Sequence, residues 1–184
     1  MTGLRQAPRG RIARGLILGI SLIWAALPAA AEEDERSRWA LQVSGFTHHF
    51  QGTRSRTHPS WNSVNTGTGL QYDIREDATT RWSTALSVGE LKDSYGVVGP
   101  YAGIALQYRL NDARIRARLG LGAFLAWRAL DWTATRKLTF LPMPVLSVED
   151  TRTGLGFNLT GTPSIRYDDR RIVSFVFIQG TYRF

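Results

Sequence analysis

The chain has 184 residues, no cysteine, 11% aromatic residues and a formal net charge of +8. Four of its cations, Arg5, Arg9, Arg11 and Arg14, lie within the first 31 residues, so loss of that segment would lower the net charge to +4. The remaining charge gives little support for nucleic-acid binding, and the absence of cysteine is compatible with passage through an oxidising periplasm.

Residues 1–31 have the pattern of a cleaved signal peptide. The four arginines form a positive n-region, and the apolar run from Leu16 to Leu27 is short for a bilayer span. Pro28 ends this run, and the alanines at 29–31 provide small residues for cleavage. The alternative is an uncleaved membrane anchor. Because the cleavage site is good and no stop-transfer pattern follows, we expect cleavage and one mature domain over residues 32–184.

The mature sequence consists of short runs in which apolar and other side chains alternate. In residues 114–128, one parity holds Ile115, Leu119, Leu121, Leu125 and Trp127, and the other holds Arg116, Arg118, Gly120 and Gly122. The first set suits lipid and the second suits an interior, which is the pattern of a transmembrane β-barrel. We predict eight strands, at about 39–50, 64–75, 80–92, 98–110, 114–128, 139–149, 153–162 and 172–184. The predicted fold is all-β: an eight-stranded antiparallel up-and-down transmembrane β-barrel.

The lengths of the predicted connections indicate which end of this barrel faces the periplasm and which faces outward. Residues 76–79, 111–113 and 150–152 form short connections, whereas 51–63, 93–97, 129–138 and 163–171 are mostly longer. Outer-membrane barrels have short periplasmic turns and longer outer loops. The terminal Tyr182-Arg183-Phe184 resembles the signal that the barrel-assembly machinery of Gram-negative bacteria reads. These features favour a membrane barrel over the alternative, a soluble lipocalin-like barrel.

Two polar clusters fall on the predicted outer rim. His48-His49 ends the first strand, and Lys92-Asp93-Ser94-Tyr95 follows the third. Histidine, aspartate and serine are the residue types of acyl transfer, because a base removes a hydroxyl proton and a carboxylate orients the imidazole. Parity alone does not decide which histidine points inward. The alternative interpretation is a polar rim on which histidine, aspartate and serine have no catalytic role. No spacing of ligands predicts a metal site, and no cofactor is expected.

The order of several motifs resembles the outer-membrane lipid A palmitoyltransferase family over residues 41–184. The segments that carry the resemblance are Leu91-Lys92-Asp93-Ser94-Tyr95, Leu119-Gly120-Leu121-Gly122, Pro142-Met143-Pro144-Val145-Leu146 and Thr162-Pro163. The resemblance implies transfer of a palmitoyl-like acyl chain from a glycerophospholipid to lipid A, without cofactor or metal. It maps the family's three essential residues onto His48, Asp93 and Ser94. His48 is selected because Asn62 follows it by 14 residues, as an asparagine follows the family's histidine.

Further residues are expected to serve the lipid substrates. Gly99, Gly103 and Ala105 would leave room for an acyl chain, and the resemblance implies that Ala105 lies at the pocket floor and favours a somewhat shorter chain. Proline cannot donate to a sheet ladder, so gaps for lateral lipid entry are expected at Pro142, Pro144 and Pro163. Arg54 and Arg56, in the first outer loop, would meet lipid A phosphates, with a solvated loop as the alternative.

We therefore expect a monomeric acyltransferase in the outer membrane of a Gram-negative bacterium, with its active site facing the exterior. The enzymatic alternative is a lipid A deacylase or esterase, in which water replaces the acceptor hydroxyl. The alternative from another class is a non-catalytic structural or adhesion barrel. A polar, fully plugged interior would favour the structural barrel, whereas a dry outer cavity open at the prolines would favour the acyl-chain enzyme.

Overall fold

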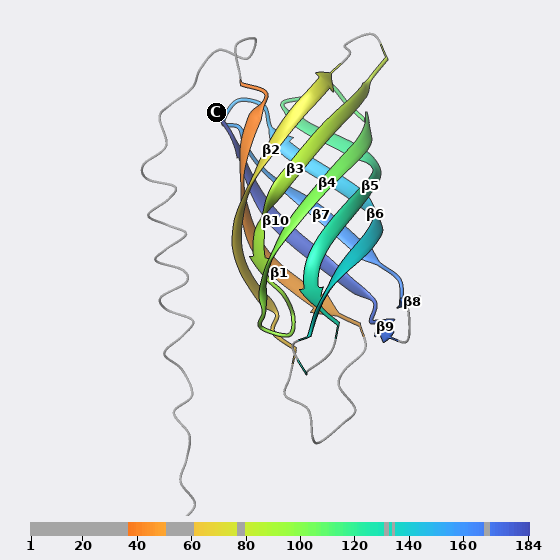
Figure 1. Cartoon of the computed structure of the whole chain (residues 1–184). Coiled ribbons are helices and arrows are strands. Elements are labelled where there is room, and N and C mark those ends of the chain that lie inside the picture. The colour runs from red at the N-terminus through yellow and green to blue at the C-terminus, as the bar shows by residue number, and fades with distance from the viewer. Residues whose placement is uncertain (1–36, 51–60, 77–79, 131–132, 134, 168–169) are drawn as a thin grey trace, which may run out of the picture. The chain divides into compact units, whose positions relative to one another are not determined.

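The computed structural model describes residues 37–50, 61–76, 80–130, 133, 135–167 and 170–184. The predicted signal peptide lies outside these ranges. The described residues form a closed antiparallel barrel of eight strands, which confirms the predicted fold class (Figure 1). Among these residues, no helix is long and apolar enough to cross a membrane.

The barrel strands follow one another around the ring in chain order, and β1 pairs with β10 to close it. They are β1 (Trp39–His49), β2 (Val64–Glu76), β3 (Trp82–Lys92), β4 (Val98–Arg109), β5 (Ile115–Ala129), β6 (Arg136–Asp150), β7 (Leu155–Thr162) and β10 (Phe175–Arg183). Between β7 and β10, the short strands β8 (Ile165–Tyr167) and β9 (Arg170–Ile172) form a separate two-stranded sheet. The last barrel strand therefore begins at Phe175 rather than at the predicted 172, because this small hairpin occupies the preceding residues.

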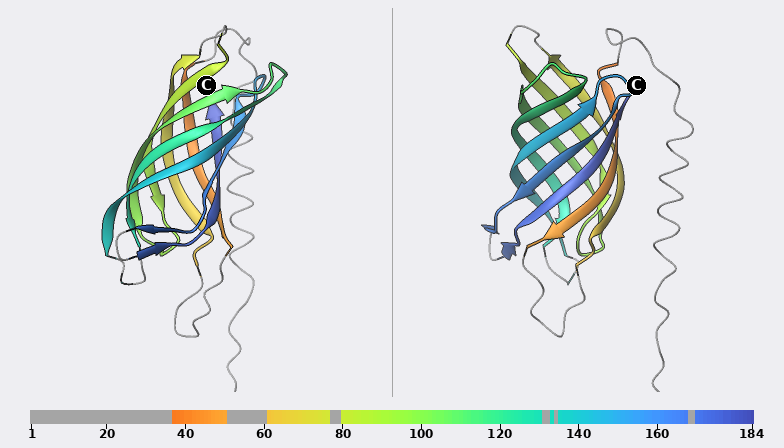
Figure 2. Two further views of the ribbon diagram at one scale, coloured as in Figure 1. Left: turned by 90° about the vertical axis from the view of Figure 1, so that its right-hand side faces the viewer. Right: turned by 180° about the vertical axis from the view of Figure 1, so that it is seen from behind.

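Side chains alternate between the interior and the outer surface as predicted. In β5, Leu119, Leu121 and Trp127 are exposed on the outside, and the buried Arg118 has the opposite parity. Large apolar side chains on the outside recur on every barrel strand, from Leu41 on β1 to Ile178 on β10. The outer wall is therefore apolar over the tilted strands seen in Figure 2, which suits contact with hydrocarbon.

The two ends of the barrel differ in their connections. The short β2–β3, β4–β5 and β6–β7 turns lie at the end that holds the chain's C-terminus, called here the terminal end (Figures 1 and 2). A 2.8 Å hydrogen bond from the N–H of Ser37 to the carbonyl oxygen of Phe184 joins the start of β1 to the end of β10 there. The β1–β2, β3–β4, β5–β6 and β7–β10 connections lie at the opposite end, called here the loop end.

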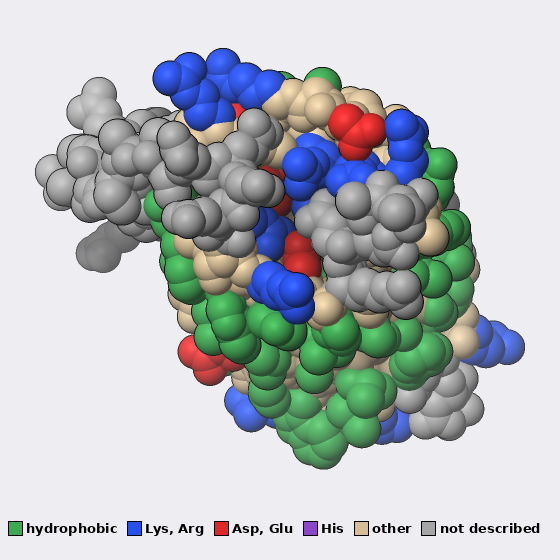
Figure 3. All heavy atoms as spheres, turned by 90° about the horizontal axis from the view of Figure 1, so that it is seen from above, with side chains coloured by type: hydrophobic (Ala, Val, Ile, Leu, Met, Phe, Trp, Pro, Cys, Tyr) green, Lys and Arg blue, Asp and Glu red, His purple; other side chains and the backbone are tan. Residues whose placement is uncertain are grey.

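An ion-pair network fills the interior of the terminal end. Asp73 Oδ2 lies 2.8 Å from Nη2 of Arg183 and 3.3 Å from Nη1 of Arg118. Nε of Arg183 also lies 3.0 Å from Oε1 of Glu149. Figure 3, which looks into this end, shows basic and acidic side chains near the middle of this face and hydrophobic ones along its lower and right margins. Buried charges are retained at such a site only when they are paired, so this half of the interior is plugged.

Candidate functional site

A histidine and a serine from distant parts of the chain meet at the loop end. His49 is the last residue of β1, and Ser94 lies in the β3–β4 connection. Nε2 of His49 is 2.8 Å from Oγ of Ser94. Ser94 is buried and His49 is partly buried. This is the distance at which an imidazole can take a proton from a hydroxyl nucleophile.

Aromatic neighbours fix the orientation of the His49 ring. It stacks on Trp61 with ring centroids 4.7 Å apart and lies 6.0 Å from the ring of Phe175. Trp61 in turn meets Tyr95 edge-on at 5.0 Å. Nδ1 of His49 is buried and has no hydrogen-bond partner among the described residues. Among the described residues, packing rather than a carboxylate therefore holds the imidazole.

The structure places His48 away from this pair, which corrects the choice between the two histidines. His48 is exposed and lies edge-on to Phe50, with ring centroids 5.2 Å apart. A β-bulge between Ser44 and Phe46 shifts the register of β1 against both of its neighbours. Even-numbered residues point inward before this bulge and odd-numbered residues after it. The inward histidine is consequently His49, and spacing in the sequence does not reveal such a change.

Asp93 lies next to Ser94, but its carboxylate is bound to the backbone. Oδ1 accepts hydrogen bonds from the N–H groups of Tyr95 and Val97, and Oδ2 accepts one from the N–H of Ala129, each at 2.9 Å. Asp93 therefore shapes the β3–β4 turn and ties it to β5. It is not hydrogen-bonded to His49, as a triad would require.

Two asparagines attach the β3–β4 turn to β2. The N–H of Asn62 donates to the carbonyl oxygen of Ser94 at 2.9 Å, and its side-chain amide donates to that of Asp93 at 3.1 Å. The side-chain amide of Asn65 donates to the carbonyl oxygen of Lys92 at 2.8 Å. In the sequence, Asn62 stands out only by its spacing from His48. These bonds show that it positions the segment that carries Ser94.

Below Ser94 the interior holds a cavity of about 120 Å³. Its lining combines residues of the β3–β4 turn with inward side chains of the barrel strands. The larger aliphatic and phenylalanine side chains among them are Leu91, Val97, Phe124, Leu141, Met143, Val145, Phe175 and Phe177. Asp93 and Ser94 also line it. The hydroxyl of Ser94 therefore lies at the boundary between a polar rim and an apolar chamber.

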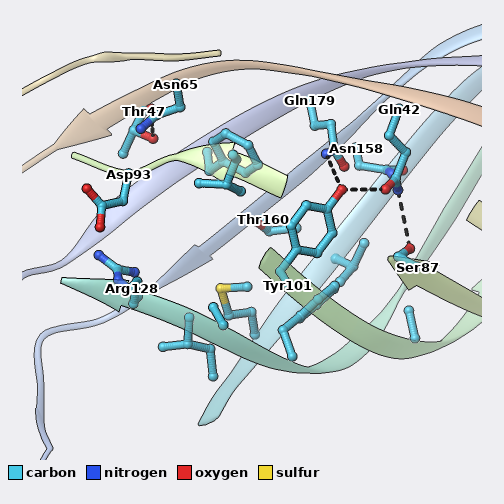
Figure 4. Close-up of a pocket in the computed structure, with 18 of the residues that line it drawn as sticks. Gln42, Thr47, Asn65, Ser87, Asp93, Tyr101, Arg128, Asn158, Thr160 and Gln179 are labelled. Carbon is cyan, nitrogen blue, oxygen red and sulfur yellow. Dashed lines mark hydrogen bonds between the residues drawn. The ribbon is translucent and has the colours of Figure 1, made fainter. Parts of the chain in front are cut away.

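A layer of amides and hydroxyls closes the cavity toward the terminal end (Figure 4). The hydroxyl of Tyr101 donates to Oε1 of Gln42 at 2.8 Å and accepts from Nε2 of Gln179 at 3.1 Å. Nε2 of Gln42 donates to Oγ of Ser87 at 3.2 Å. Because these groups satisfy one another, the floor is rigid and separates the apolar chamber from the ion pairs below. Sequence reasoning did not identify Tyr101, although its inward parity on β4 was a usable signal.

The three predicted acyl-pocket residues have different surroundings. Gly99 and Ala105 line the cavity. A Cβ on Gly99 would lie 1.8 Å from the carbonyl oxygen of Trp127, so glycine lets β4 approach β5 closely there. A Cβ on Gly103 would lie 2.2 Å from Cδ1 of Phe124. The Phe124 ring thus occupies the space that Gly103 leaves, and Gly103 is not part of the lining.

The predicted prolines coincide with a gap in the sheet. Pro142 and Pro144 lie on β6, exposed on the outer wall, and the β6–β7 ladder begins only at the pair of Val145 and Thr160. The ladder from β6 to β5 continues through both prolines. Their missing N–H groups therefore fall on the side of β7, where pairing stops. Pro163 follows the end of β7, beyond the last pair.

Other predictions about the site concern loops and ligands. Arg54 and Arg56 lie outside the described residues. Within the described ranges, no group of three or more histidine, cysteine or acidic side chains is placed to bind a metal ion.

No family model matches the sequence, and no curated protein matches it. Among solved structures, the N-terminal β-barrel domain of Pseudomonas aeruginosa OprF is similar, with 13% identity and a TM-score of 0.42. That similarity covers 80% of this chain and all of the other.

Proposed function

We propose that this barrel spans an outer membrane and transfers a fatty acyl chain from a glycerophospholipid to lipid A. One observation carries the proposal: the contact of His49 with Ser94 lies above an apolar cavity, and the neighbouring sheet has a gap between β6 and β7. A catalytic pair alone is compatible with many reactions. An apolar chamber beside it favours a substrate with a single alkyl chain.

The reaction would use the pair as a base and a nucleophile. A phospholipid acyl chain enters the cavity from the membrane through the β6–β7 gap, which places its ester carbonyl near Ser94. Nε2 of His49 takes the Ser94 proton while Oγ attacks the carbonyl carbon. The bond between that carbon and the glycerol oxygen breaks, and the glycerol oxygen takes the proton from His49, which releases lysophospholipid.

The acyl group then leaves Ser94 in a second step. A lipid A hydroxyl gives its proton to His49 and attacks the acyl-serine carbonyl. The bond to Oγ breaks, and Oγ takes the proton back, which regenerates Ser94. If water attacks in place of the lipid A hydroxyl, the same pair acts as an esterase on the phospholipid. If lipid A itself is the acyl donor, attack of water makes the pair a deacylase. Exclusion of water by the apolar lining favours transfer.

Expression in a Gram-negative host tests the proposal. Mass spectrometry of lipid A should show a gain of one acyl mass that Ser94→Ala abolishes, with the folded barrel still present in the outer membrane. A loss of one acyl mass would assign deacylation. Unchanged lipid A and phospholipid spectra with a folded wild-type barrel contradict both enzymatic functions.

The second candidate is a non-catalytic outer-membrane barrel, and the environment of Asp93 favours it. Its carboxylate is fully used by three backbone N–H groups, and no carboxylate orients His49 among the described residues. The ion pairs that plug the terminal end also suit a structural barrel. This candidate predicts that Ser94→Ala changes neither lipid A nor phospholipid composition.

A further inference from the structure

Arg128 provides an unused hydrogen-bond donor group beside the apolar cavity. It lies near the end of β5, its side chain is partly buried, and it lines both the main cavity and the smaller recess that contains His49 and Trp61. Among the described residues that line these two spaces, it is the only lysine or arginine. The guanidinium is therefore placed between the chamber for an alkyl chain and the catalytic imidazole.

The contacts of Arg128 with the other described residues leave its outer nitrogens available. Nε makes a long hydrogen bond of 3.4 Å to the carbonyl oxygen of Ala129, and the guanidinium carbon lies 6.0 Å from the ring centroid of Phe175. Neither contact uses Nη1 or Nη2, and no hydrogen bond from these atoms joins them to another described residue. Each carries two N–H donors in the planar arrangement that fits a carboxylate or an oxyanion.

Asp93 explains how a cation that has no ion-pair partner among the described residues persists at this position. Figure 4 shows the Asp93 carboxylate and the Arg128 guanidinium facing one another at the same end of the cavity. Both carboxylate oxygens are already held by backbone N–H groups, and within the described part of the chain no ion pair joins the two residues. Asp93 thus offsets the charge of Arg128 from a distance and leaves the guanidinium donors without a hydrogen-bond acceptor at this carboxylate.

We infer that Arg128 binds the oxygen atoms at the head of one alkyl chain held in the cavity. This inference rests on the proposed function and adds a residue to it. In the transfer reaction, the guanidinium would donate hydrogen bonds to the oxyanion that forms when Ser94 attacks the ester carbonyl. A fatty acid carboxylate has the same chemistry, two oxygens with negative charge at the end of an alkyl chain, and it binds without any reaction.

Binding of dodecanoate and 1-dodecanol to the barrel in lipid nanodiscs tests the inference. Both are measured as radiolabelled ligands at a pH well above that of carboxyl titration, with empty nanodiscs as the blank. We expect the wild type to bind dodecanoate at least tenfold more tightly than dodecanol. Arg128→Met should remove this preference while changing dodecanol affinity much less than dodecanoate affinity, and Arg128→Lys should retain part of the preference. Lys92→Met, which removes an exposed rim cation, is the matched control.

Several results would overturn the inference. Arg128 would be excluded as the oxygen-binding group if the wild type bound dodecanoate and dodecanol equally well or did not bind dodecanoate. It would also be excluded if Arg128→Met still preferred dodecanoate. The assay is independent of acyl transfer. If lipid A is not modified but the carboxylate preference depends on Arg128, then the proposed function fails and the binding site remains.

The transfer assay gives a second, separate readout. If lipid A is acylated, Arg128→Met should lower kcat by about 10²–10³-fold, which is the usual effect of removing one oxyanion donor, and should change KM much less. Unchanged kcat in a folded Arg128→Met barrel would show that Arg128 has no role in the transition state and would overturn the inference for the reaction.

Discussion

Nε2 of His49 lies 2.8 Å from Oγ of Ser94, although the two residues are 45 positions apart in the chain. The adjacent His48 has its side chain on the outer wall, against Phe50. Neighbouring histidines with opposite orientations give a matched pair of variants for testing the site. Comparing variants of His49 and His48 therefore distinguishes a catalytic role of His49 from a general effect of losing an imidazole at the rim.

His49→Ala should lower acyl transfer at least 10²-fold, because the Ser94 hydroxyl loses its base. His48→Ala should retain nearly all of the activity, since its ring does not reach Ser94. Lipid A mass spectrometry measures both variants, and gel mobility of the unheated protein checks that each barrel is folded. Equal activities of the two variants would refute the assignment of His49.

Asp93→Ala should destabilise the barrel more than it affects chemistry directly. Three backbone N–H groups would lose their acceptor, so we expect a decrease of about 2–4 kcal/mol in the free energy of unfolding. Asp93→Asn keeps one side-chain oxygen, so its free energy of unfolding should lie between those of Asp93→Ala and the wild type. Denaturant unfolding in lipid vesicles measures the stabilities. Folded Asp93→Asn should keep substantial transfer activity, and complete loss would instead assign the acid to the chemistry.

A disulfide across the β6–β7 gap should block acyl transfer reversibly. Continuing the register from the pair of Val145 and Thr160 places Pro144 opposite Gly161, and the chain has no native cysteine. Pro144→Cys with Gly161→Cys should be inactive when oxidised and active after reduction, because the closed gap excludes the lipid chain.

The matched control for the disulfide across the β6–β7 gap is a second disulfide within the paired part of the same ladder. Val148 and Phe157 are partners there, so Val148→Cys with Phe157→Cys should be active whether oxidised or reduced. Full activity of the oxidised Pro144 and Gly161 variant would show that lipid does not enter between β6 and β7.

Substitution of Ala105 should change the length of the transferred chain. Ala105 is buried and lines the cavity, so Ala105→Leu should select a chain shorter by about two methylenes, and Ala105→Gly a slightly longer one. Ala102→Leu, on the exposed side of the same strand, should leave chain length unchanged. The mass added to lipid A reports the chain length directly. An identical acyl mass for Ala105→Leu and the wild type would place the chain elsewhere.

The barrel could be predicted from the sequence because its physical basis is local and periodic. Side chains alternate, as in Leu119, Gly120 and Leu121, because one face of a barrel strand contacts lipid and the other faces the barrel interior. Proline chemistry is equally local, so Pro142 and Pro144 predict a break in the ladder without knowledge of the strand register. The β8–β9 hairpin was not predicted, because three-residue strands are too short to show periodicity.

The sequence by itself determined the number of barrel strands, the orientation of their side chains in β5 and the gathering of histidine, aspartate and serine at one end. Only the tertiary structure decided which histidine meets Ser94, because a bulge at Gly45 reverses the parity of β1. It also decided that Asp93 binds backbone N–H groups, and that Arg128 and Tyr101 mark opposite ends of one cavity. These outcomes depend on register and on contacts between distant strands, and such contacts are formed only when the sheet closes.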